Sequence, residues 1–222
     1  GAPAVLQMQE VDKPLPKANE VLIRIKSTAV NSGDVRVRGL AVKGFMRLIM
    51  RIVIGFTKPR RPILGTSFSG EVEEVGTNVK QYKKGDKVFG SSGFKFGAYA
   101  DYIVLNQNGT FVPMPTNASF NDAAAIVFGG MTATYFLQKA GIEVKKQQEV
   151  LIYGASGSVG CAAIEIAKHY NTKVTAVCSE EGVPLVKKLG SSEVVIYTKQ
   201  DFTKLSKKYD IVFDAVGKTD KR

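Results

Sequence analysis

The sequence has few of the side chains that form metal sites and disulfide frameworks. Its 222 residues include only two cysteines and one histidine. Cys161 and Cys178 fall on a predicted helix and a predicted strand, so neither a disulfide framework nor a zinc cluster is expected, and a reducing cytosol is the default compartment. No apolar run is long enough to cross a bilayer. We find no internal repeat and no low-complexity tract.

The composition is that of a globular protein with a strongly basic balance. Hydrophobic residues make up 44% and charged residues 23% of the chain, which allows a sizeable core. A length of 222 residues is enough for one large domain or two small ones. The formal net charge of +11 favours anionic partners. The lysines are scattered, with small pairs at 145–146, 187–188 and 207–208. We interpret them as a solvated surface, and a nucleic-acid footprint is the alternative.

The most informative stretch covers residues 149–168, EVLIYGASGSVGCAAIEIAK. A short apolar run, residues 150–153, predicts a buried parallel strand, and the spacing of apolar residues after Ser158 predicts a helix. The turn between them is rich in glycine. A strand, a glycine-rich turn and a helix in this order predict a dinucleotide site, because the free N–H groups at the helix start attract a pyrophosphate. Gly157 and Gly160 fit the glycine motif, and Ala155 replaces its first glycine.

Alternating apolar and polar residues dominate the first 105 positions. They predict strands over residues 20–27, 71–76, 85–90 and 97–104, separated by glycine turns, which is a barrel-like pattern. A turn at residues 28–34 leads into a short helix with Asp34 near its start.

The pattern changes after Pro113 and Pro115. Helices are predicted over residues 121–126 and 129–137, followed by strands at 173–178, 194–197 and 210–214 with helices at 182–189 and 201–206. Alternating strands and helices predict a parallel, doubly wound sheet. Four strands are found where a full dinucleotide-binding sheet has six, so we expect the domain to be incomplete.

Residues 43–61 combine large apolar side chains with Arg47 and Arg51. This segment is too short to cross a bilayer. It fits either a basic amphipathic helix on a membrane or a helix that covers an apolar pocket, and we favour the pocket. The pocket residues would be Phe45, Leu48, Ile49 and Ile52.

Several of these motifs together resemble the medium-chain dehydrogenase/reductase superfamily. Residues 76–88 resemble a hairpin of that superfamily, through Gly76, Val79, Gly85, Asp86 and Val88. Its zinc-independent quinone oxidoreductase (zeta-crystallin-like) branch is resembled by residues 30–34, 131–133, 154–160, 166–168 and 214–217. The sequence departs from that branch at Glu165, where Gln is usual, and at Ser158, where Gly is common. The resemblance implies an α/β protein with a β-rich GroES-like barrel domain at residues 1–115 and a Rossmann domain at residues 116–222.

The same resemblance bears on zinc. In the zinc alcohol dehydrogenases of the superfamily, a cysteine would stand at Asn31 and a His-Glu pair at Thr66 and Ser67. This sequence has neither, its one histidine is His169, and residues 83–111 contain no cysteine. Zinc requires several thiolate, imidazole or carboxylate ligands. A zinc-independent enzyme is therefore expected, and a zinc alcohol dehydrogenase using NAD(H) is nearly excluded.

The resemblance also implies roles for individual residues. Asn31 and Thr132 would contact the nicotinamide end of the cofactor, with Asn31 the catalytic candidate, although Asn31 is equally a turn residue that bonds its own backbone. Tyr99 and Tyr102 are more consistent with packing than with proton donation. The pyrophosphate would be held by Ser156, Gly157, Ser158, Val159 and Gly160, and the ribose by Val216 and Gly217.

Cofactor choice is decided after the second strand of the Rossmann unit. An acidic residue there would bind the 2′-hydroxyl of NAD. Ser179 can instead bond a 2′-phosphate, and Tyr197 can flank the adenosine, which favours NADPH. Glu180 and Glu181 oppose this, because carboxylates repel a phosphate, so NADH stays open.

The expected function is a cytoplasmic, zinc-independent NADPH-dependent reductase of quinones or α,β-unsaturated carbonyls. Its substrate would lie between the domains, and the full-length protein would be a homodimer without a membrane span. The alternative from another class is a nucleotide-dependent binding protein whose charge recruits RNA, for which the sequence offers no clustered basic groove.

Overall fold

The computed structural model describes residues 3–40, 44, 51–52, 55, 59–144 and 147–217. They form two compact units, Gly1–Val127 and Phe128–Arg222. The long helix α3 (Phe120–Lys139) contributes residues to both. The domain boundary after residue 115 stays a prediction.

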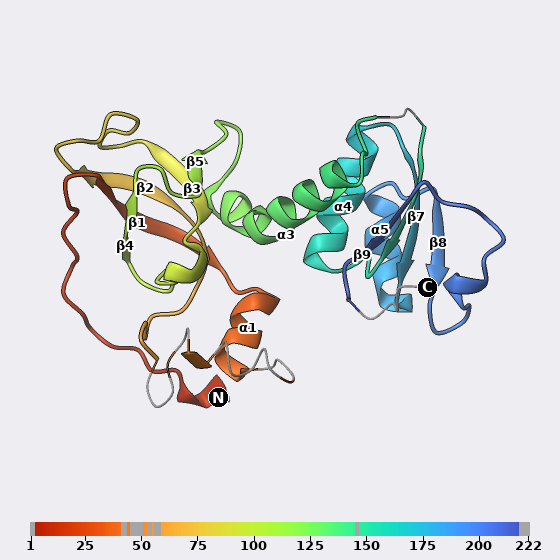
Figure 1. Cartoon of the computed structure of the whole chain (residues 1–222), viewed down its shortest axis with the longest axis horizontal. Coiled ribbons are helices and arrows are strands. Elements are labelled where there is room, and N and C mark those ends of the chain that lie inside the picture. Colours follow the sequence, from red (N-terminus) through yellow and green to blue (C-terminus); the bar gives the residue numbers. More distant parts are fainter. Residues whose placement is uncertain are drawn as a thin grey trace. The chain divides into compact units, whose positions relative to one another are not determined.

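The first unit is built on an antiparallel sheet of five strands in the order β4-β1-β2-β3-β5 (Figure 1). The strands are β1 (Glu20–Ala29), β2 (Ser67–Val75), β3 (Lys87–Ser91), β4 (Tyr102–Asn106) and β5 (Phe111–Pro113). Their inward side chains form one buried cluster that includes Val21, Ile23, Phe68, Val88 and Phe111. The short helices of this unit are η1 (Pro3–Val5), α1 (Ser32–Gly39) and η2 (Gly93–Lys95).

The β-rich pattern of the first half is confirmed, although strand bounds differ: the strand expected at 71–76 begins at Ser67, and the strand expected at 85–90 begins at Lys87. The strand expected from residue 97 begins only at Tyr102. Phe96 and Gly97 have φ values of 54° and 92°, and Tyr99 N bonds the Leu64 carbonyl, so this stretch bends across residues 63–65. The strand β5 was not expected, because three residues are too few for an alternating pattern.

The second unit contains a parallel sheet in the order β8-β7-β6-β9. Its strands are β6 (Glu149–Tyr153), β7 (Lys173–Cys178), β8 (Glu193–Ile196) and β9 (Ile211–Asp214). Its helices are α4 (Ser158–His169), α5 (Val183–Lys188) and the short η3 (Glu180–Gly182) and η4 (Phe202–Lys204). The alternation of strands and helices confirms the expected parallel sheet.

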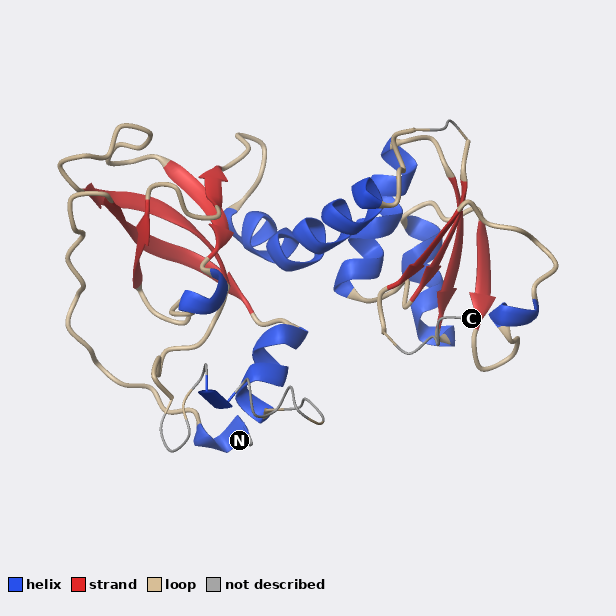
Figure 2. Ribbon diagram, in the orientation of Figure 1, coloured by secondary structure: helices blue, strands red, loops and turns tan. Residues whose placement is uncertain are grey.

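Two apolar clusters cover the two faces of this sheet. One face packs against α3, α4 and α5 through residues such as Leu137, Ile164 and Val186, and it holds Val150, Ile152 and Val174 of the strands. The other face holds Leu151, Val177 and Val195 under Phe202 and Tyr209. Figure 2 shows α4 and α5 on one side of the strands and η4 on the other. Strand residues therefore alternate between two cores, as expected where both faces are covered.

The helices at 121–126 and 129–137 are one continuous helix, α3. The Gly129-Gly130 pair does not interrupt it, although two glycines cost helical stability. A Cβ on Gly129 would lie 2.5 Å from the Ser158 carbonyl oxygen, so a glycine is needed where α3 meets the start of α4. The helix expected at 201–206 is the three-residue η4.

Candidate nucleotide-binding site

The glycine-rich turn joins β6 to α4 in the second unit. Gly154 has φ +77°, a left-handed conformation that favours glycine, and Gly157 is the residue before α4. No side chain caps the first turn of α4. By contrast, Asn31 caps α1 with its side chain. The N–H groups at the start of a helix have no partner within the helix. The start of α4 thus presents donors and a positive dipole end to an anion.

Gly160 allows the helix to pass close beneath the turn. A Cβ at this position would lie 2.3 Å from the Gly154 carbonyl oxygen and 2.6 Å from Ala155 Cα. No side chain fits there without moving the backbone. A Cβ on Gly157 would meet only the Gly154 oxygen at 3.4 Å. Gly160 is therefore required by packing, and Gly157 is not.

The turn is fixed to the neighbouring strand β7. The N–H groups of Gly154 and Ala155 both donate to the Val177 carbonyl, at 3.0 Å each. A Cβ on Gly182 would lie 2.6 Å from Ser156 Cβ, so the residues after β7 press directly against the turn. The structure thus brings Ser156–Gly160 together with the segment that begins at Ser179.

The end of β9 closes another side of the turn. A Cβ on Gly154 would lie 2.6 Å from Val216 Cγ2. The Asp214 carboxylate accepts hydrogen bonds from the N–H groups of Val216 and Gly217, both at 2.8 Å. Val216 therefore lies beside the glycine turn, and Asp214 fixes the backbone that follows it, while the expected ribose contact of Val216 and Gly217 stays a prediction. Its bonding role was not anticipated from the sequence.

The end of β7 carries two acidic residues that already have partners. The Ser179 hydroxyl donates to Glu181 and holds the pKa of that carboxyl below its usual range. Glu180 forms an ion pair with Lys199, with 2.6 Å between Oε1 and Nζ. Tyr197, which follows β8, is 47% exposed and stands edge-on to Tyr153. The Glu180–Lys199 pair was missed from the sequence because its members lie 19 positions apart, Glu180 on η3 and Lys199 in the turn after β8.

Thr132 lies on α3, one turn beyond Gly129. Its hydroxyl donates to the Phe128 carbonyl at 2.7 Å, a bond within the helix. The oxygen of this hydroxyl remains available as an acceptor.

Asn31 belongs to the first unit and is the N-cap of α1. Its Oδ1 accepts from the N–H groups of Gly33 and Asp34, at 2.8 and 3.2 Å, and its Nδ2 donates to Thr66 Oγ1 at 3.2 Å. The Asp34 carboxylate accepts from the Asn31 N–H at 3.0 Å, which completes a capping box. The reading of Asn31 as a residue that bonds its own backbone is therefore confirmed. Among the described residues, one of the two hydrogens on its Nδ2 has no acceptor.

Asp34 is buried at 4% exposure and also accepts from the Tyr99 hydroxyl at 2.9 Å. Burial, together with this bond to Asp34, raises the pKa of Tyr99. A phenol held in its neutral form by a buried carboxylate fits a packing role better than proton donation.

The pocket residues Phe45, Leu48 and Ile49 lie outside the described residues. Ile52 is helical and 49% exposed. Over the part of the chain that the structure describes, no helix is long and apolar enough to cross a membrane. Within those same ranges, no three His, Cys, Asp or Glu side chains are grouped to hold a metal ion.

An antiparallel GroES-like unit followed by a parallel sheet with a glycine turn is the architecture of medium-chain dehydrogenases/reductases. Residues 17–116 match the model of the alcohol dehydrogenase GroES-like domain. The chain is 34% identical over 223 residues to a chloroplast envelope quinone oxidoreductase homolog of Arabidopsis thaliana. It is 33% identical over 231 residues to the 2-methylene-furan-3-one reductase of Solanum lycopersicum. These alignments include 96% and 100% of this chain.

Solved structures give the same result. The quinone oxidoreductase of Coxiella burnetii has a TM-score of 0.85 at 33% identity, over 98% of this chain and 66% of that one. The Escherichia coli quinone oxidoreductase complexed with NADPH has a TM-score of 0.75 at 28% identity, over 90% of this chain and 57% of that one. The chain belongs to the medium-chain dehydrogenase/reductase superfamily, in its quinone oxidoreductase branch.

The chain spans 64% and 56% of the length of the two curated relatives. The sequence-based assignment of family and fold is confirmed.

Proposed function

We propose that the whole protein is an NADPH-dependent oxidoreductase that reduces quinones or α,β-unsaturated carbonyls without zinc. The observation that carries the proposal is the start of α4, which no side chain caps and which a glycine turn approaches closely. Two relatives support the substrate class, since one is named a quinone oxidoreductase homolog and the other a 2-methylene-furan-3-one reductase, whose named substrate contains an α,β-unsaturated ketone. The Escherichia coli structure contains NADPH, which supports the cofactor.

The residues of the second unit fit a dinucleotide. The first turn of α4, from Ser158 to Gly160, would hold the pyrophosphate by its N–H groups. Ser156 and Gly157 would line the same turn, and Val216 and Gly217 would border the ribose of the nicotinamide. Ser179 and Tyr197 would contact the adenosine end. When bound, the dihydronicotinamide supplies the hydride, and the protein contributes orientation and exclusion of water.

Asn31 and Thr132 are proposed contacts for the nicotinamide. Because both Asn31 Oδ1 bonds are made to the backbone of α1, this side chain would act through its remaining Nδ2 hydrogen as a donor. Thr132 would accept, since its own hydrogen is given to Phe128. A substrate position between the domains, lined by Phe45, Leu48, Ile49 and Ile52, remains a prediction.

Zinc independence is supported by the chemistry of the residues at the expected metal positions. Asn31 and Thr66 are neutral and bond each other at 3.2 Å. An amide and a hydroxyl are poor zinc ligands compared with thiolate and imidazole. Polarisation of the substrate would then depend on hydrogen bonds.

The test is a titration of the full-length protein with NADPH and NADH, followed by fluorescence, with metal analysis of the same sample. We expect tighter binding of NADPH, no stoichiometric zinc, and turnover of quinones or enones but not of simple alcohols. Failure to bind either nucleotide would overturn the proposal. Salt-sensitive binding of RNA in its place would favour the binding-protein alternative.

A homodimer and a cytoplasmic location are also proposals. Light scattering of the full-length protein tests the dimer. Localisation needs a direct observation, because the name of one relative refers to the chloroplast envelope.

A further inference from the structure

The carboxyl ends of β7 and β8 lie side by side in the second unit. Cys178 pairs with Ile196 in the parallel register, and the Tyr197 N–H donates to the Cys178 carbonyl at 3.2 Å. The residues that follow the two strands therefore meet at one edge of the sheet. That edge is where the ribose of a bound dinucleotide is read.

Lys199 is positioned by the turn that follows β8. The N–H groups of Lys199 and Gln200 both donate to the Ile196 carbonyl, at 2.9 and 3.0 Å. This turn points the Lys199 ammonium at Glu180, whose carboxylate lies 2.6 Å away. Both side chains are about 60% exposed, at 59% and 63%. An exposed ion pair contributes little to stability, so an incoming anion can replace the carboxylate at little cost.

The charges around Ser179 explain why a cation is needed at this edge. Ser179 is followed directly by Glu180 and Glu181, and its hydroxyl already donates to Glu181. A phosphate placed beside Ser179 would face two carboxylates. The Lys199 ammonium offsets one of them in the structure.

We propose that Lys199 is the residue that selects nucleotides carrying a 2′-phosphate, and that Glu180 holds its ammonium in place until the phosphate displaces it. The inference rests on the proposed function, because it assigns specificity within the same nucleotide site. Glu180 would have two effects. It orders the lysine before binding, and it weakens phosphate binding by repulsion.

The test uses the full-length protein and two probes, 2′,5′-ADP and 5′-AMP, in isothermal titration calorimetry at fixed ionic strength. We expect Lys199→Gln to weaken 2′,5′-ADP about tenfold, or about 1.4 kcal/mol, and 5′-AMP less than about twofold. Lys199→Arg keeps the charge and is expected to keep most of the preference. Glu180→Gln is expected to bind 2′,5′-ADP several-fold more tightly than the wild type.

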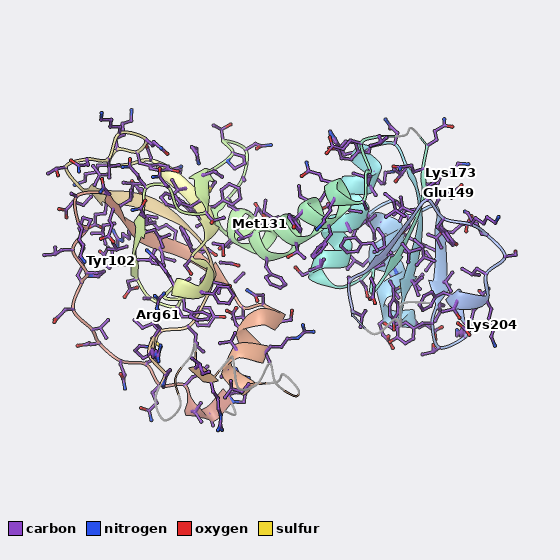
Figure 3. All side chains as sticks on the ribbon, viewed as in Figure 1. Arg61, Tyr102, Met131, Glu149, Lys173 and Lys204 are labelled. Atoms are coloured by element: carbon purple, nitrogen blue, oxygen red, sulfur yellow. The ribbon has the colours of Figure 1, made fainter. Side chains whose placement is uncertain are left out.

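Lys204→Gln is the matched control. Lys204 lies on η4, after the same strand, is 83% exposed and pairs with Asp201 at 3.8 Å (Figure 3). The Lys204→Gln substitution removes one positive charge from the segment that also contains Lys199, so it reports any general electrostatic effect on nucleotide affinity. We expect it to change both affinities by less than about twofold.

The outcomes separate the two proposals. Binding of neither probe by the wild type would overturn the proposed function, and this inference with it. If the wild type binds both and Lys199→Gln leaves their ratio unchanged, the inference alone fails. An equal loss in Lys204→Gln would assign the preference to net charge and would also overturn the role of Lys199.

Discussion

The Tyr99 hydroxyl donates a hydrogen bond to the carboxylate of Asp34, across 65 positions of the sequence. The same carboxylate oxygen, Oδ2, accepts from the Asn31 N–H, while the other oxygen, Oδ1, is buried without a hydrogen-bond partner in the described structure. Tyr99 thus joins the loop after η2 to the start of α1. This contact predicts how the first unit responds to mutation and to pH.

Tyr99→Phe is expected to destabilise the protein by about 1–3 kcal/mol, because Asp34 would lose a donor while remaining buried. Urea denaturation measures the change. Tyr135→Phe is the control, since Tyr135 is 59% exposed on α3 and its hydroxyl is accessible to water. Equal stability of Tyr99→Phe and the wild type would show that the bond has no net effect.

The same residue predicts a loss of stability in alkali. The pKa of tyrosine in an unfolded chain is about 10. In the folded state, burial and the bond to Asp34 raise the pKa of Tyr99 above its usual value. The folded state then holds a proton that the unfolded state releases, so the contribution is complete below about pH 10 and declines above it. Urea midpoints between about pH 8 and 11 should fall more steeply for the wild type than for Tyr99→Phe. Parallel curves would contradict the assignment.

The glycine pair on α3 predicts opposite effects for adjacent substitutions. Gly129→Ala would place a Cβ 2.5 Å from the Ser158 carbonyl oxygen and should destabilise the second unit by about 1–3 kcal/mol. Gly130→Ala meets nothing within 4 Å and should stabilise the helix by about 0.5–1 kcal/mol. Thermal melting of the two variants gives the comparison, and effects of the same sign would contradict the packing of α3 on α4.

Asn31 has two roles that substitution can separate. Asn31→Ala should lose about 0.5–2 kcal/mol of stability, because α1 loses its cap. Asn31→Ser keeps a capping oxygen and removes the amide, so its stability should stay close to that of the wild type. If Asn31 contacts the nicotinamide, Asn31→Ser should still lower turnover in the full-length protein. Wild-type turnover in that variant would leave Asn31 with the capping role alone.

The fold could be predicted from the sequence where patterns are local. The run at residues 150–153 and the glycine turn after it fix β6 and α4 through neighbouring residues alone. Longer-range features could not be read in this way. Gly129 and Gly130 look like a helix break in the sequence, and the close approach of Gly129 to Ser158, which requires a glycine within the unbroken α3, is visible only in the structure.

In the candidate site, too, local features could be predicted from the sequence and long-range contacts could not. Gly157 and Gly160 were found by their spacing, since they lie three positions apart in one turn of the chain. The bonds that hold the site together join distant segments, such as Glu180 with Lys199 and Gly154 with Val177. At the start of β6, Glu149 similarly pairs with Lys173 at 3.6 Å (Figure 3). It also pairs with Lys207 at 2.9 Å. Such pairs depend on strand order, which spacing along the chain does not specify.

The turn contains two populations of backbone amides. Those of Gly154 and Ala155 donate to the Val177 carbonyl, whereas those at the start of α4 have no side-chain cap. In deuterated buffer, these two amides should exchange only when β6 and β7 separate, at a rate set by the stability of the sheet. The amides of Ser158 and Val159, at the uncapped start of α4, should exchange much faster in the free protein. A nucleotide would slow the second population and leave the first nearly unchanged, so amide exchange can locate the ligand within a single turn of the chain.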